Sequence, residues 1–175
     1  LGSYPLALMV RSDVPATTVA EYVAYAKAQN RPMNFGISTI GASMHLAALE
    51  FANQTGIEMV FPPYKSGSIG ALNDLIGKQI DGIFEGAVSK PHADGGRVKA
   101  LFMGQTDRMP GWDLPSATEV GLPTFDMTAW YGLMVLSATP GAIQEQLSAD
   151  VRSVLAQPSV RERFAGLGVI AGGMS

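Results

Sequence analysis

The sequence contains no cysteine. This absence excludes disulfide bonds, thiol catalysis and metal sites with cysteine ligands. The two histidines, His45 and His92, lie far apart in the sequence, and there is no His-Glu-x-x-His motif. A Gly-x-Ser-x-Gly nucleophile turn and a Walker phosphate-binding loop are also absent. We therefore expect neither a metal site nor a cofactor.

Charged residues and long apolar runs are also scarce. Only 15% of the residues are charged and the net charge is −3, so the chain lacks the basic surface that nucleic-acid binding needs. No run approaches the roughly 18 apolar residues of a membrane-spanning helix. The chain starts at Leu1 rather than Met, without the basic and apolar start of a secretion signal, and we expect it to be a piece of a longer protein.

Short apolar runs alternate with helical patterns over the first 100 or so residues. Glycine and proline separate these segments, as is usual for turns between strands and helices. We expect strands at 6–10, 33–37, 57–61, 80–84 and 98–103, and helices at 18–29, 43–54, 68–76 and 87–93. This alternation predicts an α/β fold, with a parallel or mixed sheet covered by helices on both faces.

Residues 105–124 show no clear period and contain several prolines and glycines, which indicates a linker with at most one helical turn at 117–120. We place a domain boundary here, with residues 1–124 as one domain and 125–175 as a separate segment. That segment is expected to contain strand structure at 125–136, with Trp130 in the core, and helices at about 140–155 and 158–167. The first of these helices has an apolar stripe that we expect to be buried, comprising Ile143, Leu147, Val151 and Leu155.

Two turns rich in small polar residues link an expected strand to an expected helix, at 38–43 and 63–68. In an α/β sheet such turns lie at the carboxyl edge, where ligands bind. Free amides at a helix N-terminus favour an anion, and Gly41 and Gly67 would let the backbone approach it closely. The two turns could hold the two oxygens of a carboxylate. Alternatively, the hydroxyls of Ser38, Thr39, Ser43, Ser66 and Ser68 only cap their helices.

Six segments of the chain, in order, match the motif pattern of one known family. The first is Asn34-Phe35-Gly36-Ile37-Ser38-Thr39-Ile40-Gly41-Ala42-Ser43 with His45-Leu46, and the second is Pro63-Tyr64-Lys65-Ser66-Gly67. The others are 74–81, 96–101, Arg108 with 114–121, and Trp130-Tyr131-Gly132-Leu133 with Thr139-Pro140. Together they span nearly the whole chain, and they resemble the Bug or TctC-type periplasmic solute receptors of tripartite tricarboxylate transporters.

The resemblance implies a periplasmic-binding-protein-like (type II, Venus-flytrap) fold that clamps a small carboxylate between two domains. It implies that residues 1–124 are a complete second domain, and that 125–175 are the return segment of a first domain whose N-terminal part is lacking. It further implies a periplasmic protein without enzyme activity, whose partners are the carboxylate and the membrane components of the transporter.

In this family the carboxylate sits on backbone amides and hydroxyls of the two turns. The matching ligand-binding positions are Ser38, Thr39, Ile40, Gly41, Ala42, Ser43, Tyr64, Lys65, Ser66, Gly67 and Glu85. Three features depart from the family pattern. Thr39-Ile40 replaces small residues and would narrow the pocket, Ser66 is an extra residue, and Glu85 stands where the family usually has Asp. Glu85 could receive a ligand amine or hydroxyl, or pair with Lys65 or Lys90.

Two other functions remain open at this point. The chain could be a small serine hydrolase that uses Ser38 or Ser66 with His45, although His45 fits a structural hydrogen-bonding role better. It could also be a fragment that binds nothing and is stabilised by self-association through an exposed sheet edge.

Overall fold

The computed structural model describes residues 1–172, which form two compact units. The larger unit is Pro5–Thr128, and the smaller one contains Leu1–Tyr4 and the described residues from Ala129 onward. The boundary therefore lies four residues beyond the predicted one at Thr124, and the N-terminal residues join the smaller unit. Residues 173–175 of the predicted second segment lie outside the described residues. The assignment of the two segments to domains of a longer protein stays a prediction.

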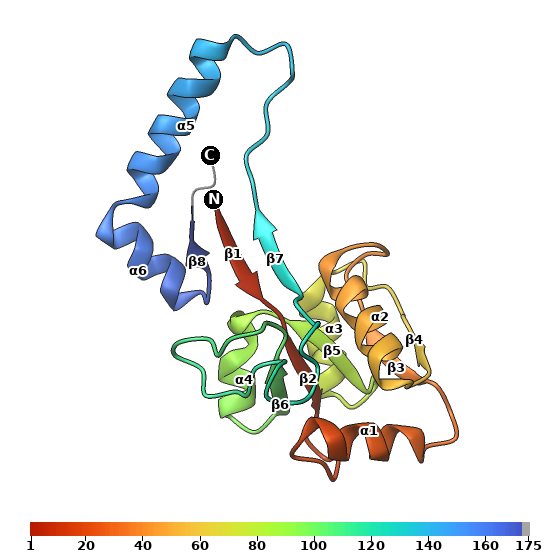
Figure 1. Ribbon diagram of the computed structural model, residues 1–175. Coiled ribbons are helices and arrows are strands. Elements are labelled where there is room, and N and C mark those ends of the chain that lie inside the picture. Colours follow the sequence, from red (N-terminus) through yellow and green to blue (C-terminus); the bar gives the residue numbers. More distant parts are fainter. Residues whose placement is uncertain (173–175) are drawn as a thin grey trace. The chain divides into compact units, whose positions relative to one another are not determined.

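The larger unit is built on a five-stranded sheet with the strand order β4-β3-β5-β2-β6 (Figure 1). Strand β3 runs parallel to β4 and β5, whereas β2 runs antiparallel to β5 and β6. The predicted mixed α/β sheet is confirmed. The strands are β2 (Ala7–Arg11), β3 (Met33–Gly36), β4 (Met59–Val60), β5 (Gly82–Glu85) and β6 (Val98–Met103).

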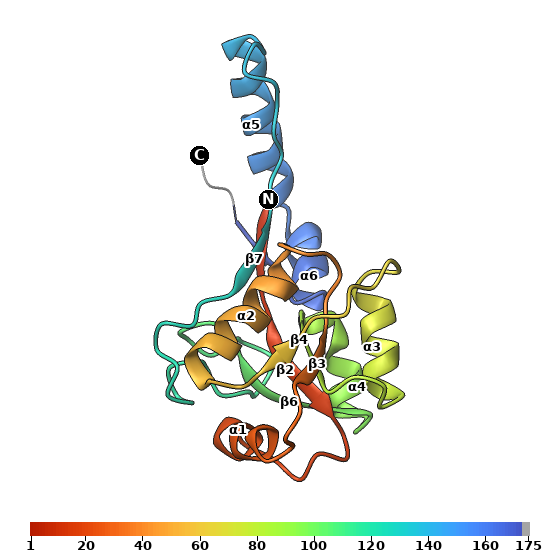
Figure 2. The ribbon, with the colours of Figure 1, turned by 90° about the vertical axis from the view of Figure 1, so that its right-hand side faces the viewer.

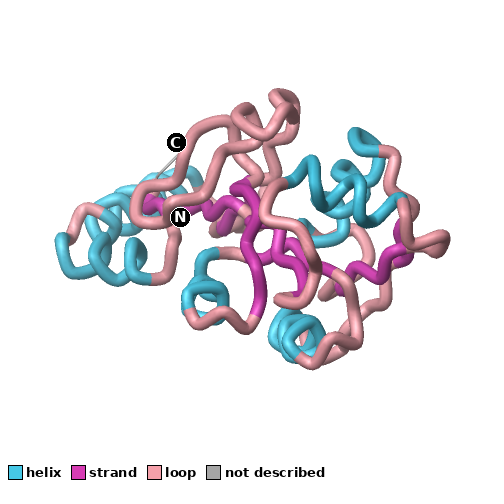
Figure 3. The backbone as a smooth tube through the Cα atoms, turned by 90° about the horizontal axis from the view of Figure 1, so that it is seen from below, coloured by secondary structure: helices cyan, strands magenta, loops and turns pink. Residues whose placement is uncertain are grey.

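Helices cover both faces of this sheet. Helices α2 and α3 lie on opposite sides of the strands in Figure 2, and helices flank the strands when the molecule is seen from below in Figure 3. The helices of this unit are α1 (Val19–Lys27), α2 (Ser43–Thr55), α3 (Ser68–Ile76), η1 (Ala87–Ser89) and α4 (Lys90–Asp94). All of them fall within or beside the predicted ranges, so the periodicity of the sequence located them correctly.

The face of the sheet under α2 holds an aromatic core. The ring of Phe51 from α2 lies 5.7 Å from that of Phe84 in β5 and 5.9 Å from that of Phe102 in β6. Phe125, which precedes β7, packs 5.6 Å from Phe84. Side chains alternate along a strand, so Ile83 points to the opposite face, where it belongs to a buried cluster with Leu75 of α3.

Local sequence signals fix the ends of two helices. The Thr18 side chain accepts a hydrogen bond from the Glu21 amide at 3.2 Å, and the Glu21 carboxylate accepts one from the Thr18 amide at 3.2 Å. This reciprocal pair is a capping box at the start of α1. Gly56 ends α2 in the left-handed region with φ 68°, as predicted.

Residues 104–127 form no helix or strand, which agrees with the predicted linker. The Val120 amide donates to the Ser116 carbonyl at 3.2 Å, so the sequence makes a single helical turn there. Arg108 holds this segment together because its guanidinium contacts Glu119 at 2.8 Å and Asp113 at 2.8 Å. The bond from Arg108 lowers the pKa of Glu119 to about 2.

The smaller unit has a three-stranded sheet in the order β7-β1-β8, with two helices. Its elements are β1 (Gly2–Pro5), β7 (Thr128–Tyr131), α5 (Gly141–Leu155), α6 (Pro158–Gly166) and β8 (Ile170–Ala171). The predicted strand structure at 125–136 is therefore shorter in the structure.

Two burial predictions for this unit are wrong. Trp130 is exposed rather than in the core, and of the predicted buried stripe on α5 only Leu155 is buried, while Ile143 is 51% exposed. After β7, Met134 and Leu136 are 78% and 81% exposed. The described elements of this unit are too few to cover both the strand and the helix, so part of their apolar surface faces solvent.

A buried hydroxyl offers the first stability prediction. Tyr22 in α1 is fully buried, its hydroxyl has no hydrogen-bond partner among the described residues, and burial raises its pKa. An unsatisfied buried hydroxyl is destabilising, so Tyr22→Phe is expected to raise the free energy of unfolding by about 1 kcal/mol. Urea denaturation measures this change. The half-buried Tyr25 gives the control, Tyr25→Phe, which should leave stability nearly unchanged; a loss of stability in Tyr22→Phe would contradict the prediction.

Candidate functional site

The two predicted turns begin side by side at one edge of the larger sheet. Beyond the end of β3, the Ile37 amide donates to the Pro62 carbonyl at 3.1 Å, and the Tyr64 amide donates to the Ile37 carbonyl at 2.8 Å. Because β3, β4 and β5 are parallel, their carboxyl ends share this edge. The structure therefore brings the turns 38–43 and 63–68 together with the end of β5.

The first turn, before α2, is organised by a histidine. The Gly41 amide donates to Nδ1 of His45 at 3.0 Å, and the His45 ring packs edge-on against Phe61 with centroids 5.0 Å apart. Gly41 has φ 83°, a conformation that glycine adopts without strain. Its amide is thus used inside the turn rather than left for a ligand. The structural hydrogen-bonding role predicted for His45 is confirmed. The Gly-x-x-x-His spacing was the sequence signal for its partner, Gly41, which our sequence reasoning did not identify.

The second turn, before α3, is held by a tyrosine. The Tyr64 hydroxyl donates to the Asp74 carboxylate of α3 at 2.7 Å, and burial together with this bond raises the pKa of Tyr64 to about 12. The extra residue, Ser66, lies against Gly70, where its hydroxyl occupies the space that a Cβ would need. Tyr64 therefore fixes the helix in place, and Lys65 is exposed beside it.

The hydroxyls of the two turns do not cap their helices. The residues at the helix starts, Ala42 for α2 and Gly67 for α3, make no side-chain capping bond, in contrast to Thr18 of α1. The capping interpretation is therefore wrong for these turns. No hydrogen bond is formed within residues 1–172 by the side chains of Ser38, Thr39, Ser43, Ser66 and Ser68. The first amides of both helices also lack intrahelical acceptors, so each end keeps unsatisfied donors and a positive dipole end.

Two further predicted residues, Ile40 and Glu85, lie in the segments at this edge of the larger sheet. Ile40 is 72% exposed, so in the structure its side chain extends into solvent. Glu85, the last residue of β5, is only 7% exposed, and its Oε1 accepts a hydrogen bond from the Gly86 amide at 2.8 Å. Neither alternative ion pair of Glu85 forms, because Lys90 pairs with Asp94 at 2.6 Å and no described residue makes an ion pair with Glu85.

The described residues contain no assembled hydrolase or metal centre. Nδ1 of His45 accepts the Gly41 amide, and among residues 1–172 neither Ser38 nor Ser66 bonds to His45, so a nucleophile and base are not paired. The same residues hold no group of three or more histidine, aspartate or glutamate side chains that could bind a metal. No helix in this part of the chain is long and apolar enough to cross a membrane.

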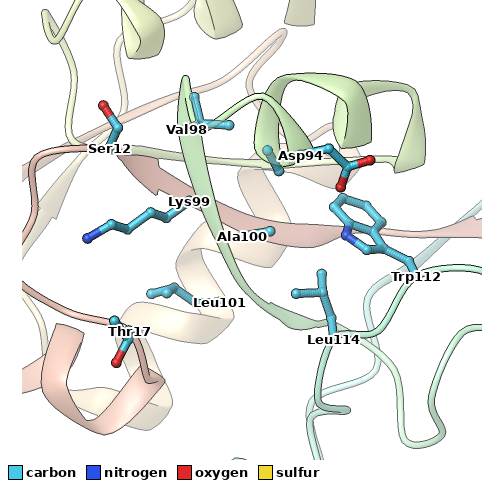
Figure 4. Close-up of a pocket in the computed structure, with 11 residues that line it drawn as sticks. Ser12, Thr17, Asp94, Val98, Lys99, Ala100, Leu101, Trp112 and Leu114 are labelled. Carbon is cyan, nitrogen blue, oxygen red and sulfur yellow. The ribbon is translucent and has the colours of Figure 1, made fainter.

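A concavity of about 420 Å³ lies elsewhere, along β6. In Figure 4, Trp112 and Leu114 lie to one side of Leu101, and Thr17 lies to the other. None of the predicted ligand residues lines it. Sequence reasoning missed it because its walls come from four separate segments.

The architecture is that of a periplasmic binding protein, as comparison with solved structures shows. The chain matches a Rhodopseudomonas palustris protein, Rpa4515 with adipate, at a TM-score of 0.91 and 29% identity, over 100% of this chain and 59% of that chain. MatC of the same organism, with bound malate, matches at 0.88 and 29% identity, over 98% and 58%. The periplasmic binding protein BugD matches at 0.87 and 29% identity, over 97% and 57%.

Residues 1–173 match the family model of the tripartite tricarboxylate transporter family receptor, TctC, and the chain belongs to this family. A curated relative from Agrobacterium vitis, the UPF0065 protein in the TAR-I ttuE-ttuC' intergenic region, is 32% identical over 95% of this chain and 48% of its own length. A UPF0065 protein of Pseudomonas sp. strain P51, from the tcbD-tcbE intergenic region, is 28% identical over 98% and 52%. The chain spans about half the length of these relatives.

These matches confirm the resemblance, the binding-protein fold and the prediction that the chain is not an enzyme, since its family and its structural neighbours are solute receptors. The individual ligand-binding residues stay predictions.

Proposed function

We propose that this chain is the ligand-binding part of an extracytoplasmic receptor that takes up a small carboxylate in the periplasm and presents it to the membrane components of a tripartite tricarboxylate transporter. The observation that carries the proposal is the pair of adjacent, uncapped turns before α2 and α3. Two of the matching solved structures contain a dicarboxylate, adipate in one and malate in the other. This supports a carboxylate as the class of ligand.

In this proposal the carboxylate lies on the first amides of α2 and α3 and on the hydroxyls around them. Ser38, Thr39, Ser43 and Ser66 supply hydroxyl donors, and Lys65 supplies positive charge at the rim. Ile40, Gly41, Ala42 and Gly67 shape the backbone, while Tyr64 anchors α3 through Asp74. These donors form hydrogen bonds to the carboxylate, in the same way that the free backbone amides of a helix N-terminus bind other anions.

We further propose that the unit Pro5–Thr128 is one complete lobe of the receptor, and that the smaller unit is the return segment of the other lobe. The exposed apolar residues of the smaller unit support this, because Met134, Leu136 and Ile143 form the kind of surface that a protein normally buries against another element. The part of the relatives that this chain does not span would supply that cover and the opposite wall of the cleft.

The function is tested by thermal shift and titration calorimetry with adipate, malate and further small mono- and dicarboxylates. A ligand that binds the folded chain must raise its apparent stability, so at least one acid is expected to shift the melting temperature. Absence of any shift and of any binding heat would contradict the proposal. If the chain also self-associates in sedimentation experiments, the alternative of a non-binding, self-associating chain is supported instead.

A single substitution tests the turn. Gly41→Val places a β-branched residue at φ 83° and displaces the turn amides, so carboxylate affinity is expected to fall about tenfold, the effect of about 1.4 kcal/mol. The matched control is Gly121→Val, because Gly121 has the same φ of 83° and equally open space around its Cβ position but lies outside the turns. The control should lose stability without losing affinity. Unchanged affinity in Gly41→Val would refute the assignment of this turn.

A further inference from the structure

The concavity along β6 lies apart from the turns that the proposed function assigns to the carboxylate. In the order β4-β3-β5-β2-β6, two strands separate β6 from β3, which leads into the first of these turns. The volume of the concavity, about 420 Å³, is in the usual range of small-molecule sites, about 300–1,000 Å³. A molecule bound in it would therefore occupy a separate site.

The walls of the concavity are mostly apolar. Val98, Leu101 and Leu114 line it, and the rest of the chain buries most of each of these residues. Closely packed side chains have little room to change their position. The concavity therefore offers an apolar surface that exists before any ligand binds.

One wall also carries a hydrogen-bond donor that the chain does not use. Trp112 is 6% exposed, and its indole N–H makes no hydrogen bond within residues 1–172. In Figure 4 the indole nitrogen lies on the side of the ring that faces Ala100 of β6. The unpartnered polar atoms that are sealed from solvent in the described residues are the Tyr22 hydroxyl and Nδ1 of His92, so the indole nitrogen stays accessible. Because a buried indole N–H usually has a partner, this donor points to an acceptor supplied by a ligand.

The charged residues that line the concavity favour a neutral ligand. The carboxylate of Asp94 would oppose an anion, and because it already pairs with Lys90 at 2.6 Å, a cation would gain little from it. The ammonium of Lys99 donates to the carbonyls of Val14 and Ala16, and in Figure 4 it points away from the indole ring. Neither charge is therefore available to the ligand at this wall.

The open stretch of β6 is short, although β6 is an edge strand. At one end the Met103 amide donates to the Pro115 carbonyl at 2.8 Å, and at the other the Lys99 ammonium holds residues 14–16 beside the strand. Addition of a peptide strand relies on main-chain hydrogen bonds along several residues of an edge. A compact molecule therefore suits this place better than an extended peptide.

We propose that the concavity along β6 is a second ligand site of this chain, for a compact, neutral and mostly apolar molecule that carries a carbonyl group. The carbonyl accepts the indole N–H of Trp112, and the apolar part lies against Leu101 and Leu114. None of the residues assigned to the carboxylate lines the concavity, so this site does not depend on the proposed function.

Three compounds with the same two-ring skeleton test the site. In 2-naphthamide a neutral carbonyl is present, naphthalene lacks any acceptor, and 2-naphthoate carries a negative charge. Titration of the full chain at pH 7 is expected to show saturable binding of 2-naphthamide in the concavity. Naphthalene and 2-naphthoate should bind there at least about threefold more weakly, the effect of one net hydrogen bond.

The indole N–H of Trp112 itself reports binding. The chain has two tryptophans, and Trp130 lies in the smaller unit, so the variant Trp130→Phe assigns the two indole resonances in a proton–nitrogen NMR spectrum. Titration with 2-naphthamide is expected to shift the Trp112 resonance and to leave the Trp130 resonance in place. Any 2-naphthoate that binds at the carboxylate turns would leave both in place.

Two variants test the residues of the site by calorimetry. Trp112→Phe removes the donor and keeps an aromatic ring, so it should weaken 2-naphthamide binding about three- to tenfold and change naphthalene binding less than about twofold. Ala100→Leu places a larger side chain opposite the indole and should abolish the binding of both compounds. Trp130→Phe is the matched control and should change neither affinity. If Trp112→Phe does not fold, Ala100→Leu and the ranking of the three compounds on the wild type decide the matter.

The outcomes separate this site from the receptor function. A shift of the Trp112 resonance by 2-naphthamide, with weaker binding in Trp112→Phe and unchanged binding in Trp130→Phe, supports the second site. The site is overturned if 2-naphthamide does not bind, if it binds no better than naphthalene, or if Trp112→Phe and Ala100→Leu leave its affinity unchanged. Carboxylate binding at the turns should be the same in wild type and both variants, so either result leaves the receptor function standing.

Discussion

Replacing Phe84 with alanine is expected to lower the free energy of unfolding by about 4 kcal/mol, the usual cost of removing a buried ring. Phe84 is fully buried and its ring lies 5.7 Å from Phe51, 6.2 Å from Phe102 and 5.6 Å from Phe125. The substitution leaves a cavity between α2 and the sheet that rigid neighbours fill only in part. Since domains are stable by about 5–15 kcal/mol, the variant should lose a large share of its stability.

Urea denaturation followed by circular dichroism measures this effect on the larger unit. Leu46→Ala on α2 is the control, because Leu46 is exposed, and its loss should stay below about 1 kcal/mol. A similar loss in both variants would show that the aromatic cluster is not the main support of the sheet.

The second large effect is expected from Asp81→Asn. The carboxylate of Asp81 accepts bonds from Arg31 and from the Asn34 amide, while its side chain is 4% exposed. Arg31 is 42% exposed and can be hydrated after the substitution, so the loss should be smaller than for a fully buried pair. We expect a loss of about 2–3 kcal/mol at pH 7, most of it from polar groups left without a charged partner.

The pH dependence of the free energy of unfolding tests the same prediction in a second way. Burial opposes ionisation of Asp81, but the bonds from Arg31 and Asn34 outweigh burial and hold its pKa below the usual 3.8. A carboxylate with a lowered pKa contributes stability at neutral pH that is lost as the pH falls through the folded-state pKa. The difference between wild type and Asp81→Asn should therefore be constant from about pH 6 to 8 and shrink below about pH 4.

A surface carboxylate provides the control. Asp13 pairs with Arg11 at 2.9 Å, and this hydrogen bond lowers its pKa to about 2, but its side chain is 37% exposed. Because exposed ion pairs contribute little, Asp13→Asn should cost less than about 1 kcal/mol. If the two variants lose equal stability, the burial of Asp81 does not carry the effect.

Much of the larger unit could be predicted because the signals are local. Thr18 and Glu21 stand at capping-box spacing, Gly56 ends α2 with a positive φ, and short apolar runs mark β2 and β6. Each of these preferences arises from the backbone and side chains of a few consecutive residues. The two turns could also be placed at one sheet edge, because parallel strands end together.

The site itself was predictable only in outline. The sequence indicated that hydroxyls, glycines and helix N-termini would lie together at one sheet edge. It did not indicate which of these hydrogen-bond donors bond to other residues of the chain and are therefore not available to a ligand. Gly41 was a candidate for contacting the ligand, yet His45 takes its amide, and the Tyr64 hydroxyl binds Asp74. Such pairings depend on which side chains meet in three dimensions, and in this sequence several acceptors were possible for each donor.

The sequence alone determined the α/β alternation, the absence of cysteine chemistry and the family. These follow from residue types and their spacing along the chain. The tertiary structure decided that the turns are uncapped, that Glu85 is buried without a countercharge, and that only Leu155 of the apolar stripe on α5 is buried. The burial of a side chain and its bonding partners depend on tertiary packing, because the residues around it come from segments that are distant in sequence and meet only on folding.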